Sequence, residues 1–166
     1  MPHVISTKLP GTAFLNTYEQ SKGVYTDCFQ TELPKGVSLE SFINAFFNTW
    51  LFRLERLILS IAAKKPATDG DIARLADGTS DTMSAWQVER RDDDQILLEV
   101  PKTPIRTWLM REGEGETTQL YFGSAILPHA TDRNGNPKMP FLFHALLGFH
   151  KLYARALLFS AKRALR

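Results

Sequence analysis

Four runs of residues typical of β-strands follow one another between residues 82 and 127, separated only by short turns. In the clearest run, Ile96, Leu98 and Val100 point to one face of the strand, and Gln95 and Glu99 point to the other. This period of two is typical of a strand with one covered face. Runs joined by short turns pair as antiparallel neighbours. The four predicted strands are Thr82–Arg91, Gln95–Pro101, Pro104–Glu112 and Glu116–Leu127.

A further strand is expected near the N-terminus, over Tyr25–Leu33, and Pro34 ends it. Ser38 is a good N-cap for an amphipathic helix that we expect to continue to about Ala63. Thr68 and the residues after it predict a second, short helix. This region therefore adds one strand and two helices before the four-strand series.

The last predicted helix begins at Pro140 and continues to the end of the chain, a length of roughly 40 Å at 1.5 Å per residue. Its polar side chains occupy a narrow wedge, and the rest of its circumference is apolar or small. We therefore expect the sheet and other elements to pack around it. The wedge contains His144, Lys151, Arg155, Lys162 and Arg166.

The order of these elements predicts an α+β fold in which the long C-terminal helix packs on a curved antiparallel sheet. The length of 166 residues fits one domain of ordinary size. We expect this domain to occupy residues 24–166. Residues 1–23 show no sustained period and are expected to form a loosely attached N-terminal arm.

The same order resembles the helix-grip fold of the START-like superfamily, which includes the birch-pollen allergen, polyketide cyclases and lipid-transfer domains. The chain also contains Tyr25-x-Asp27-x-Phe29, Trp50 with Arg56, Trp86-x-Val88, Arg106-x-Trp108-Leu109 and Leu120-x-Phe122-Gly123-Ser124-Ala125. These short patterns resemble an uncharacterised bacterial domain family of unknown function, sometimes joined to short-chain-dehydrogenase-like domains. The resemblance implies a curved sheet with a cavity against the C-terminal helix, and it brings no catalytic signature.

Two charged residues share strand faces with aromatic residues and are candidates for a ligand site. Asp27 lies on the same face as Tyr25, and Arg106 lies on the same face as Trp108. If the aromatic side chains point inward, the charges do too, and they then need each other or a ligand as partners. We expect Arg106 to lie near Asp27 or a bound anion. The alternative is a structural ion pair, or a strand whose opposite face (with Leu109) is the buried one.

His150 and Tyr153 are the other candidates, because they lie on the part of the C-terminal helix that should face the sheet. Together they can line a cavity or transfer a proton. A histidine with ordinary core partners is the alternative.

These residues favour a non-catalytic module that binds a small apolar or amphipathic ligand between the sheet and the C-terminal helix. One alternative is a small cofactor-independent lyase, isomerase or cyclase that uses Asp27, His150 or Tyr153. Another is a membrane-surface or protein-interaction domain, since residues after Asp132 include seven basic and no acidic side chains. The ordinary explanation of this charge is that it complements the helix C-terminus and keeps its outer face hydrated. Ligand identity and oligomeric state are not predicted.

Other classes of protein have little support. The single cysteine, Cys28, fits a reducing interior and a cytoplasmic location, and the N-terminus shows no signal peptide. No motif predicts a cofactor, a nucleotide loop, a nucleophile with a base, or a metal site. Residues 132–143 resemble a calcium loop, but their glycine falls at the fourth position and Phe143 replaces the final Glu. We also find no transmembrane segment and no strong nucleic-acid signal.

Overall fold

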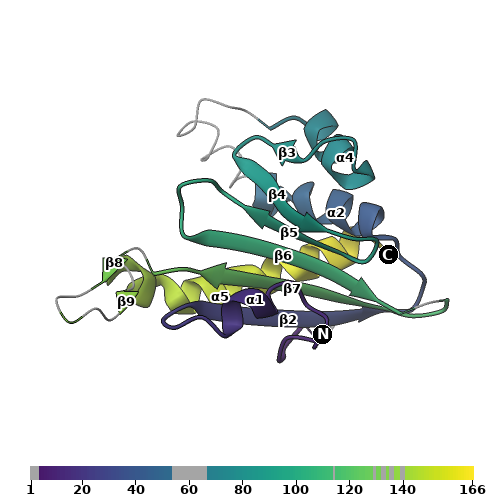
Figure 1. Ribbon diagram of the computed structural model, residues 1–166. Coiled ribbons are helices and arrows are strands. Elements are labelled where there is room, and N and C mark those ends of the chain that lie inside the picture. The colour runs from purple at the N-terminus through teal and green to yellow at the C-terminus, as the bar shows by residue number, and fades with distance from the viewer. Residues whose placement is uncertain are drawn as a thin grey trace.

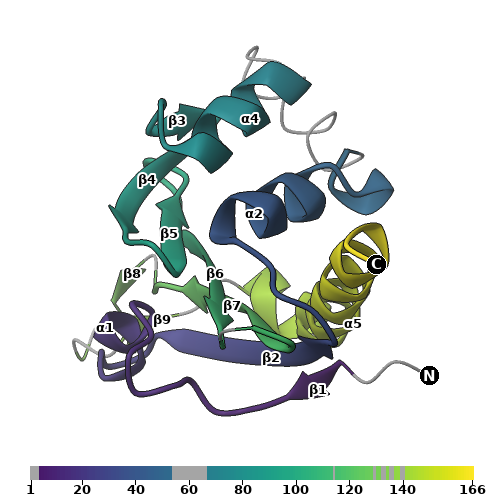
Figure 2. The ribbon, with the colours of Figure 1, turned by 90° about the vertical axis from the view of Figure 1, so that its right-hand side faces the viewer.

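A curved antiparallel sheet forms the framework of this computed structural model, which describes residues 4–53, 67–113, 115–128, 130–131, 134, 137–138 and 141–166. Figures 1 and 2 show that the sheet curls round the helices packed against its concave face. Within these residues the strands are β1 (Ile5–Ser6), β2 (Tyr25–Leu33), β3 (Thr82–Met83), β4 (Trp86–Arg91), β5 (Gln95–Glu99), β6 (Ile105–Glu112), β7 (Thr118–Ile126), β8 (Ala130–Thr131) and β9 (Pro137–Lys138). The helices are α1 (Asn16–Glu19), α2 (Leu39–Phe47), α4 (Asp69–Asp77) and α5 (Phe141–Ala164).

The described strands β1 to β7 form one antiparallel sheet in the order β1-β2-β7-β6-β5-β4-β3, while β8 and β9 pair separately. The first long strand, β2, therefore lies beside the last, β7, with Asp27 opposite Ser124. This arrangement confirms the predicted α+β class with a curved antiparallel sheet and a long C-terminal helix.

The strand predictions agree with the structure except at their ends and at one break. The predicted bounds of β2 are confirmed, and β5, β6 and β7 fall inside their predicted ranges. The run Thr82–Arg91 is not one strand, because Ser84 adopts a φ of 54° and turns the chain back between β3 and β4. Neither glycine nor proline marks this turn in the sequence.

The helix predicted from Ser38 to Ala63 is shorter than expected. Ser38 caps α2 as predicted, its side-chain oxygen accepting from the backbone N–H of Ser41 at 3.1 Å. The helix ends at Phe47, and Thr49 accepts the backbone N–H of Phe52 with its side chain, as at the start of a new helical segment. Residues 54–63 of the predicted helix lie outside the described residues. Thr68 caps α4 with the reciprocal bonds of a capping box, as predicted.

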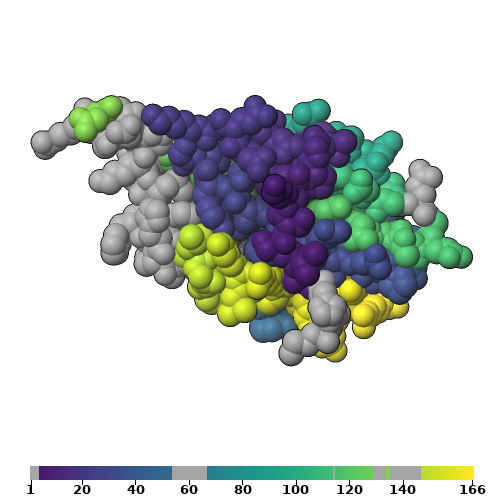
Figure 3. All heavy atoms as spheres, turned by 90° about the horizontal axis from the view of Figure 1, so that it is seen from below, coloured from purple at the N-terminus to yellow at the C-terminus, as the bar shows by residue number. Residues whose placement is uncertain are grey.

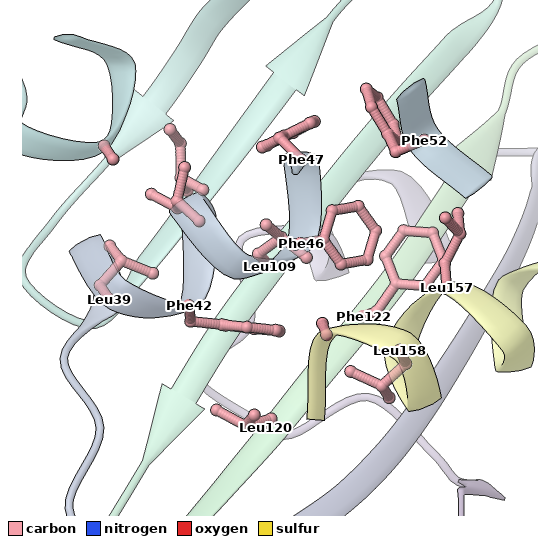
Figure 4. Packing of buried hydrophobic residues seen from close by; sticks show 14 of the residues in the cluster. Leu39, Phe42, Phe46, Phe47, Phe52, Leu109, Leu120, Phe122, Leu157 and Leu158 are labelled. Atoms are coloured by element: carbon pink, nitrogen blue, oxygen red, sulfur yellow. The ribbon is translucent and has the colours of Figure 1, made fainter. Parts of the chain in front are cut away.

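The main core lies between the concave face of the sheet and the helices α2, α4 and α5. Figure 4 shows Phe46 of α2 directed toward Phe122 of β7 and Leu157 of α5, and the Phe46 and Phe122 ring centroids are 4.8 Å apart. Ile96 and Leu98 of β5 are buried in the same cluster, so the predicted alternation of that strand is confirmed. The helix α5 packs on β2 and β7, and α2 packs on β6.

The convex face of the sheet is covered as well, by the N-terminal residues. In Figure 3 this purple segment lies across the sheet beside β2. Phe14 and Leu15 are buried with Trp108 of β6, and β1 pairs with β2. The expectation of a loosely attached arm is therefore wrong for residues 9–18, because Leu9, Phe14, Leu15 and Tyr18 belong to a second, smaller core on this face.

Lys162 was predicted to lie on the polar, solvent-facing side of the C-terminal helix, but the structure buries it. It is only 6% exposed, and its ammonium donates to the Thr31 hydroxyl at 3.1 Å. Burial lowers the pKa of this lysine, and the neighbouring positive charge of Arg166 lowers it further. Lys151 and Arg155 are exposed, as expected, while the side chain of His144 lies outside the described part of the chain.

None of the helices described is both long enough and apolar enough to cross a membrane.

Candidate functional site

The carboxylate of Asp27 lies on the concave face of β2 and is held by donors from three elements. The backbone N–H of Ser124, its neighbour on β7, donates to Oδ1 at 2.9 Å. The Tyr25 hydroxyl donates to Oδ2 at 3.2 Å, and the Nε2 atom of His150 on α5 lies 2.9 Å from the same oxygen. The Asp27 side chain is 6% exposed, so these contacts replace most of its hydration.

His150 connects α5 to the sheet through this contact, as its predicted position on the inner side of the helix implies. Its side chain is 27% exposed, and the Tyr25 ring meets the imidazole edge-on with centroids 6.3 Å apart. Asp27 holds Nε2, and the described residues provide no hydrogen-bond partner for Nδ1. The protein therefore fixes one nitrogen of His150, while the other has no partner in the part of the chain that the structure describes.

A cavity of about 140 Å³ lies next to this pair, between α5 and the strands β6 and β7. The lining is mostly aromatic and aliphatic, with polar atoms from Thr107, Ser124 and His150. Ile105 lines the cavity and is 45% exposed, so the cavity reaches the surface beside it. The lining residues are Phe46, Phe52, Ile105, Thr107, Phe122, Ser124, Ile126, His150, Tyr153, Ala154 and Leu157.

Tyr153 forms part of this lining, as expected for a residue one turn from His150. Its ring stacks on Phe149 with centroids 6.0 Å apart, and its hydroxyl donates to the backbone carbonyl of Leu51 at 3.4 Å. The phenol thus connects α5 to the segment that follows α2. Phe149 is itself largely exposed, so the stack lies at the edge of the cavity.

The structure places Arg106 on the opposite face of the sheet from Asp27, so the expected pairing of these two residues is wrong. Its guanidinium binds Glu89 at 2.8 Å and Glu99 at 3.0 Å, and its Nε donates to the Tyr18 hydroxyl at 3.0 Å. Arg106 is therefore the centre of a polar cluster that fastens α1 to the convex face. Its role there is structural.

Trp108 is buried, as expected of a large aromatic residue, but beneath the N-terminal arm. Its indole Nε1 donates to the side-chain oxygen of Gln95 at 2.9 Å. Its neighbour Leu109 faces the main core, which was the alternative interpretation of this strand. Since both faces of the sheet are covered, the burial of Trp108 does not bring Arg106 near Asp27.

Sequence reasoning did not identify Ser124, Phe46 or Phe122 as parts of the site. The role of Ser124 depends on its backbone N–H, which carries no residue-type signal. Phe46 and Phe122 look like ordinary core residues in a sequence. Only the register between β2 and β7 could have indicated that Ser124 faces Asp27.

Burial also affects two acidic groups next to Asp27. Desolvation and the nearby Asp27 carboxylate raise the pKa of Tyr25 well above its ordinary value, so its hydroxyl keeps its proton and donates. Burial raises the pKa of the Cys28 thiol to about 12. Cys28 is therefore a poor nucleophile, consistent with its position in the convex-face core. The described side chains contain no group of three or more metal-ligating residues.

No protein-family model matches this chain, and no curated protein matches it.

Proposed function

We propose that this protein is a helix-grip domain of the START-like type that binds a small apolar ligand in the cavity beside His150. The fold supports this proposal through the position of α5, which crosses the concave face of a sheet whose first long strand pairs with its last. The observation that carries the proposal is the cavity itself. It combines an aromatic lining with one histidine, held by Asp27, at its wall.

The cavity volume limits the ligand to a small molecule. Ligand pockets for drug-sized molecules enclose about 300–1,000 Å³, whereas this cavity encloses about 140 Å³. Apolar cavities of about 150 Å³ bind molecules of the size of benzene. The proposed ligand is therefore a single ring or a short chain rather than a whole lipid.

Toluene is a suitable probe, because it fits this volume and has no polar group. Titration followed by amide ¹H–¹⁵N NMR should shift the signals of Phe122, Ser124 and Ala154, with a dissociation constant in the millimolar range. Ala154→Leu fills the cavity from α5 and should abolish these shifts. Ala164→Leu, an exposed position on the same helix, should leave them unchanged. If saturating toluene shifts no cavity amide in the unmodified protein, the cavity is not a ligand site.

A second candidate function is proton transfer on a ligand in the same cavity, by a cofactor-independent lyase, isomerase or cyclase. The Asp27–His150 contact supports it, since a carboxylate that orients an imidazole is a common arrangement for a general base. His150→Gln would then abolish turnover of a substrate while Tyr153→Phe would report any role of the phenol. Binding with no turnover by the unmodified protein would favour the first function.

A further inference from the structure

The hydrogen bonds around Asp27 determine which nitrogen of His150 carries the proton. Oδ1 accepts from the Ser124 backbone N–H, and Oδ2 accepts from the Tyr25 hydroxyl. A carboxylate only accepts hydrogen bonds, so the 2.9 Å contact between Oδ2 and Nε2 places a proton on Nε2. In a neutral imidazole the other nitrogen, Nδ1, is then an acceptor.

The lining of the cavity argues against an anionic ligand. No lysine or arginine is among the described residues that line it. The Asp27 carboxylate lies behind His150, where it repels a second anion at short range. A carboxylate or phosphate would therefore enter an apolar space without a lysine or arginine among the described lining residues to pair with.

The lining also favours an aromatic ring, because Phe46, Phe52, Phe122 and Tyr153 surround the space. Aromatic rings pack edge-to-face or offset with additional stabilisation beyond the buried area.

From these observations we propose that the cavity selects a neutral hydroxylated aromatic molecule of the phenol class, whose O–H donates to Nδ1 of His150. This inference rests on the proposed ligand-binding function and specifies its chemistry. Asp27 is then a positioning residue: it does not contact the ligand, and it sets the acceptor character of Nδ1 by holding Nε2–H.

The substitution Asp27→Asn tests this role, because it should reverse the tautomer of His150. The Ser124 N–H still requires an acceptor at the position of Oδ1, which orients the amide oxygen toward Ser124 and the amide nitrogen toward His150. The amide nitrogen donates, so Nε2 becomes the acceptor and Nδ1 gains the proton. Long-range ¹H–¹⁵N spectra of the histidine ring distinguish the two tautomers directly.

Binding of toluene, phenol and benzoate should be measured by NMR titration for the unmodified protein, Asp27→Asn and His150→Leu. One neutral hydrogen bond contributes about 1 kcal/mol, or roughly a fivefold change in affinity. Phenol should therefore bind the unmodified protein about fivefold more tightly than toluene, and benzoate should bind most weakly. Both variants should lose the preference for phenol and keep their affinity for toluene.

The outcomes separate this inference from the proposed function. If toluene and phenol bind equally to the unmodified protein, or if benzoate binds best, the ligand class is wrong although the cavity is a site. If Asp27→Asn switches the tautomer and phenol is still preferred, the ligand O–H does not donate to Nδ1, and the positioning role of Asp27 is wrong. If neither neutral probe binds, the proposed function itself fails.

Discussion

Gly123 lies where the N-terminal arm and Trp108 pack closely on the backbone of β7. A Cβ atom added there would lie 2.7 Å from the backbone oxygen of Asp27 and 3.0 Å from atoms of both Leu15 and Trp108. A glycine inside a strand most often marks a bulge or bend, but the register through Gly123 is continuous with both neighbouring strands. The glycine is needed because the arm and Trp108 approach the β7 backbone closely.

We therefore predict that Gly123→Ala destabilises the protein by about 1–3 kcal/mol, the usual cost of inserting a methyl group into a packed core. Gly148→Ala is the matched control, since nothing lies within 4 Å of the added atom and the position is in α5. The helix propensity of alanine should stabilise this control by about 0.5–1 kcal/mol. Urea unfolding of the three proteins measures both effects, and equal stability of Gly123→Ala would contradict the close approach.

Among single residues of the site, some positions could be predicted from the sequence and others could not. Strand and helix periods placed Asp27 and His150 on inward faces, and the structure agrees. Their contact could not be predicted, because it joins residues 123 positions apart and depends on how α5 lies on β2. Arg106 was placed wrongly for a physical reason. An aromatic neighbour indicates a covered face, and this sheet is covered on both faces.

At the scale of elements, a buried side-chain amide, Gln95, makes several of the hydrogen bonds that attach the N-terminal arm. The Gln95 side-chain oxygen accepts from the Phe14 backbone and from the Trp108 indole, both at 2.9 Å, and its nitrogen donates to the Thr12 carbonyl at 3.0 Å. Gln95 thus joins β5, β6 and the arm. Apolar contacts of Phe14 and Leu15 complete the attachment.

Gln95→Met keeps the size of the side chain and removes these bonds. Two buried donors would be left without an acceptor, at about 1–3 kcal/mol each, so we expect a loss of about 2–6 kcal/mol. The arm should also become more sensitive to limited proteolysis near residues 10–20. Gln87→Met is the control, because Gln87 is exposed on β4 and its replacement should change stability by less than about 0.5 kcal/mol. Unchanged proteolysis of Gln95→Met would show that the other contacts of the arm hold it without the bonds of Gln95.

Element boundaries were predictable where residue chemistry marks them. Thr68 caps α4 in a capping box, as predicted, and Gly78 ends the helix in the left-handed conformation that glycine adopts readily. The end of α2 had a signal as well, since Thr49 is a good cap residue, but the continuous apolar stripe favoured one long helix. No residue type in the sequence signals the turn at Ser84, whose positive φ accompanies the pairing of Met83 with Trp86.

At the scale of the whole molecule, a sheet covered on both faces buries acidic groups on both faces too. Tyr25 lies on the concave side, and Cys28 and Tyr121 lie on the convex side. Burial is the main cause that raises the pKa of Cys28 and of Tyr121 to about 12, and it raises the pKa of Tyr25 further. The pKa of Lys162 is shifted the other way, because burial lowers it below its ordinary value.

These shifts predict that the protein loses stability at alkaline pH. Between the ordinary pKa values of about 8.5–10 and the raised values, the unfolded chain releases protons that the folded chain keeps. The unfolded state therefore binds fewer protons, and the free energy of unfolding falls as pH rises above about 9. Lys162 offsets part of this fall below about pH 10, since there the unfolded chain binds more protons at that lysine.

Urea unfolding between pH 7 and pH 11.5 measures this dependence, and Tyr121→Phe identifies one of its sources. The variant loses the hydrogen bond from the Tyr121 hydroxyl to Glu112, 2.9 Å long, and should be less stable at pH 7 by about 1 kcal/mol. It has no phenol to titrate at that position, so its stability should fall less steeply above pH 10. The two curves should therefore converge as pH rises. Parallel curves would mean that the Tyr121 hydroxyl titrates alike in the folded and unfolded chains, and that burial beneath the arm does not protect its proton.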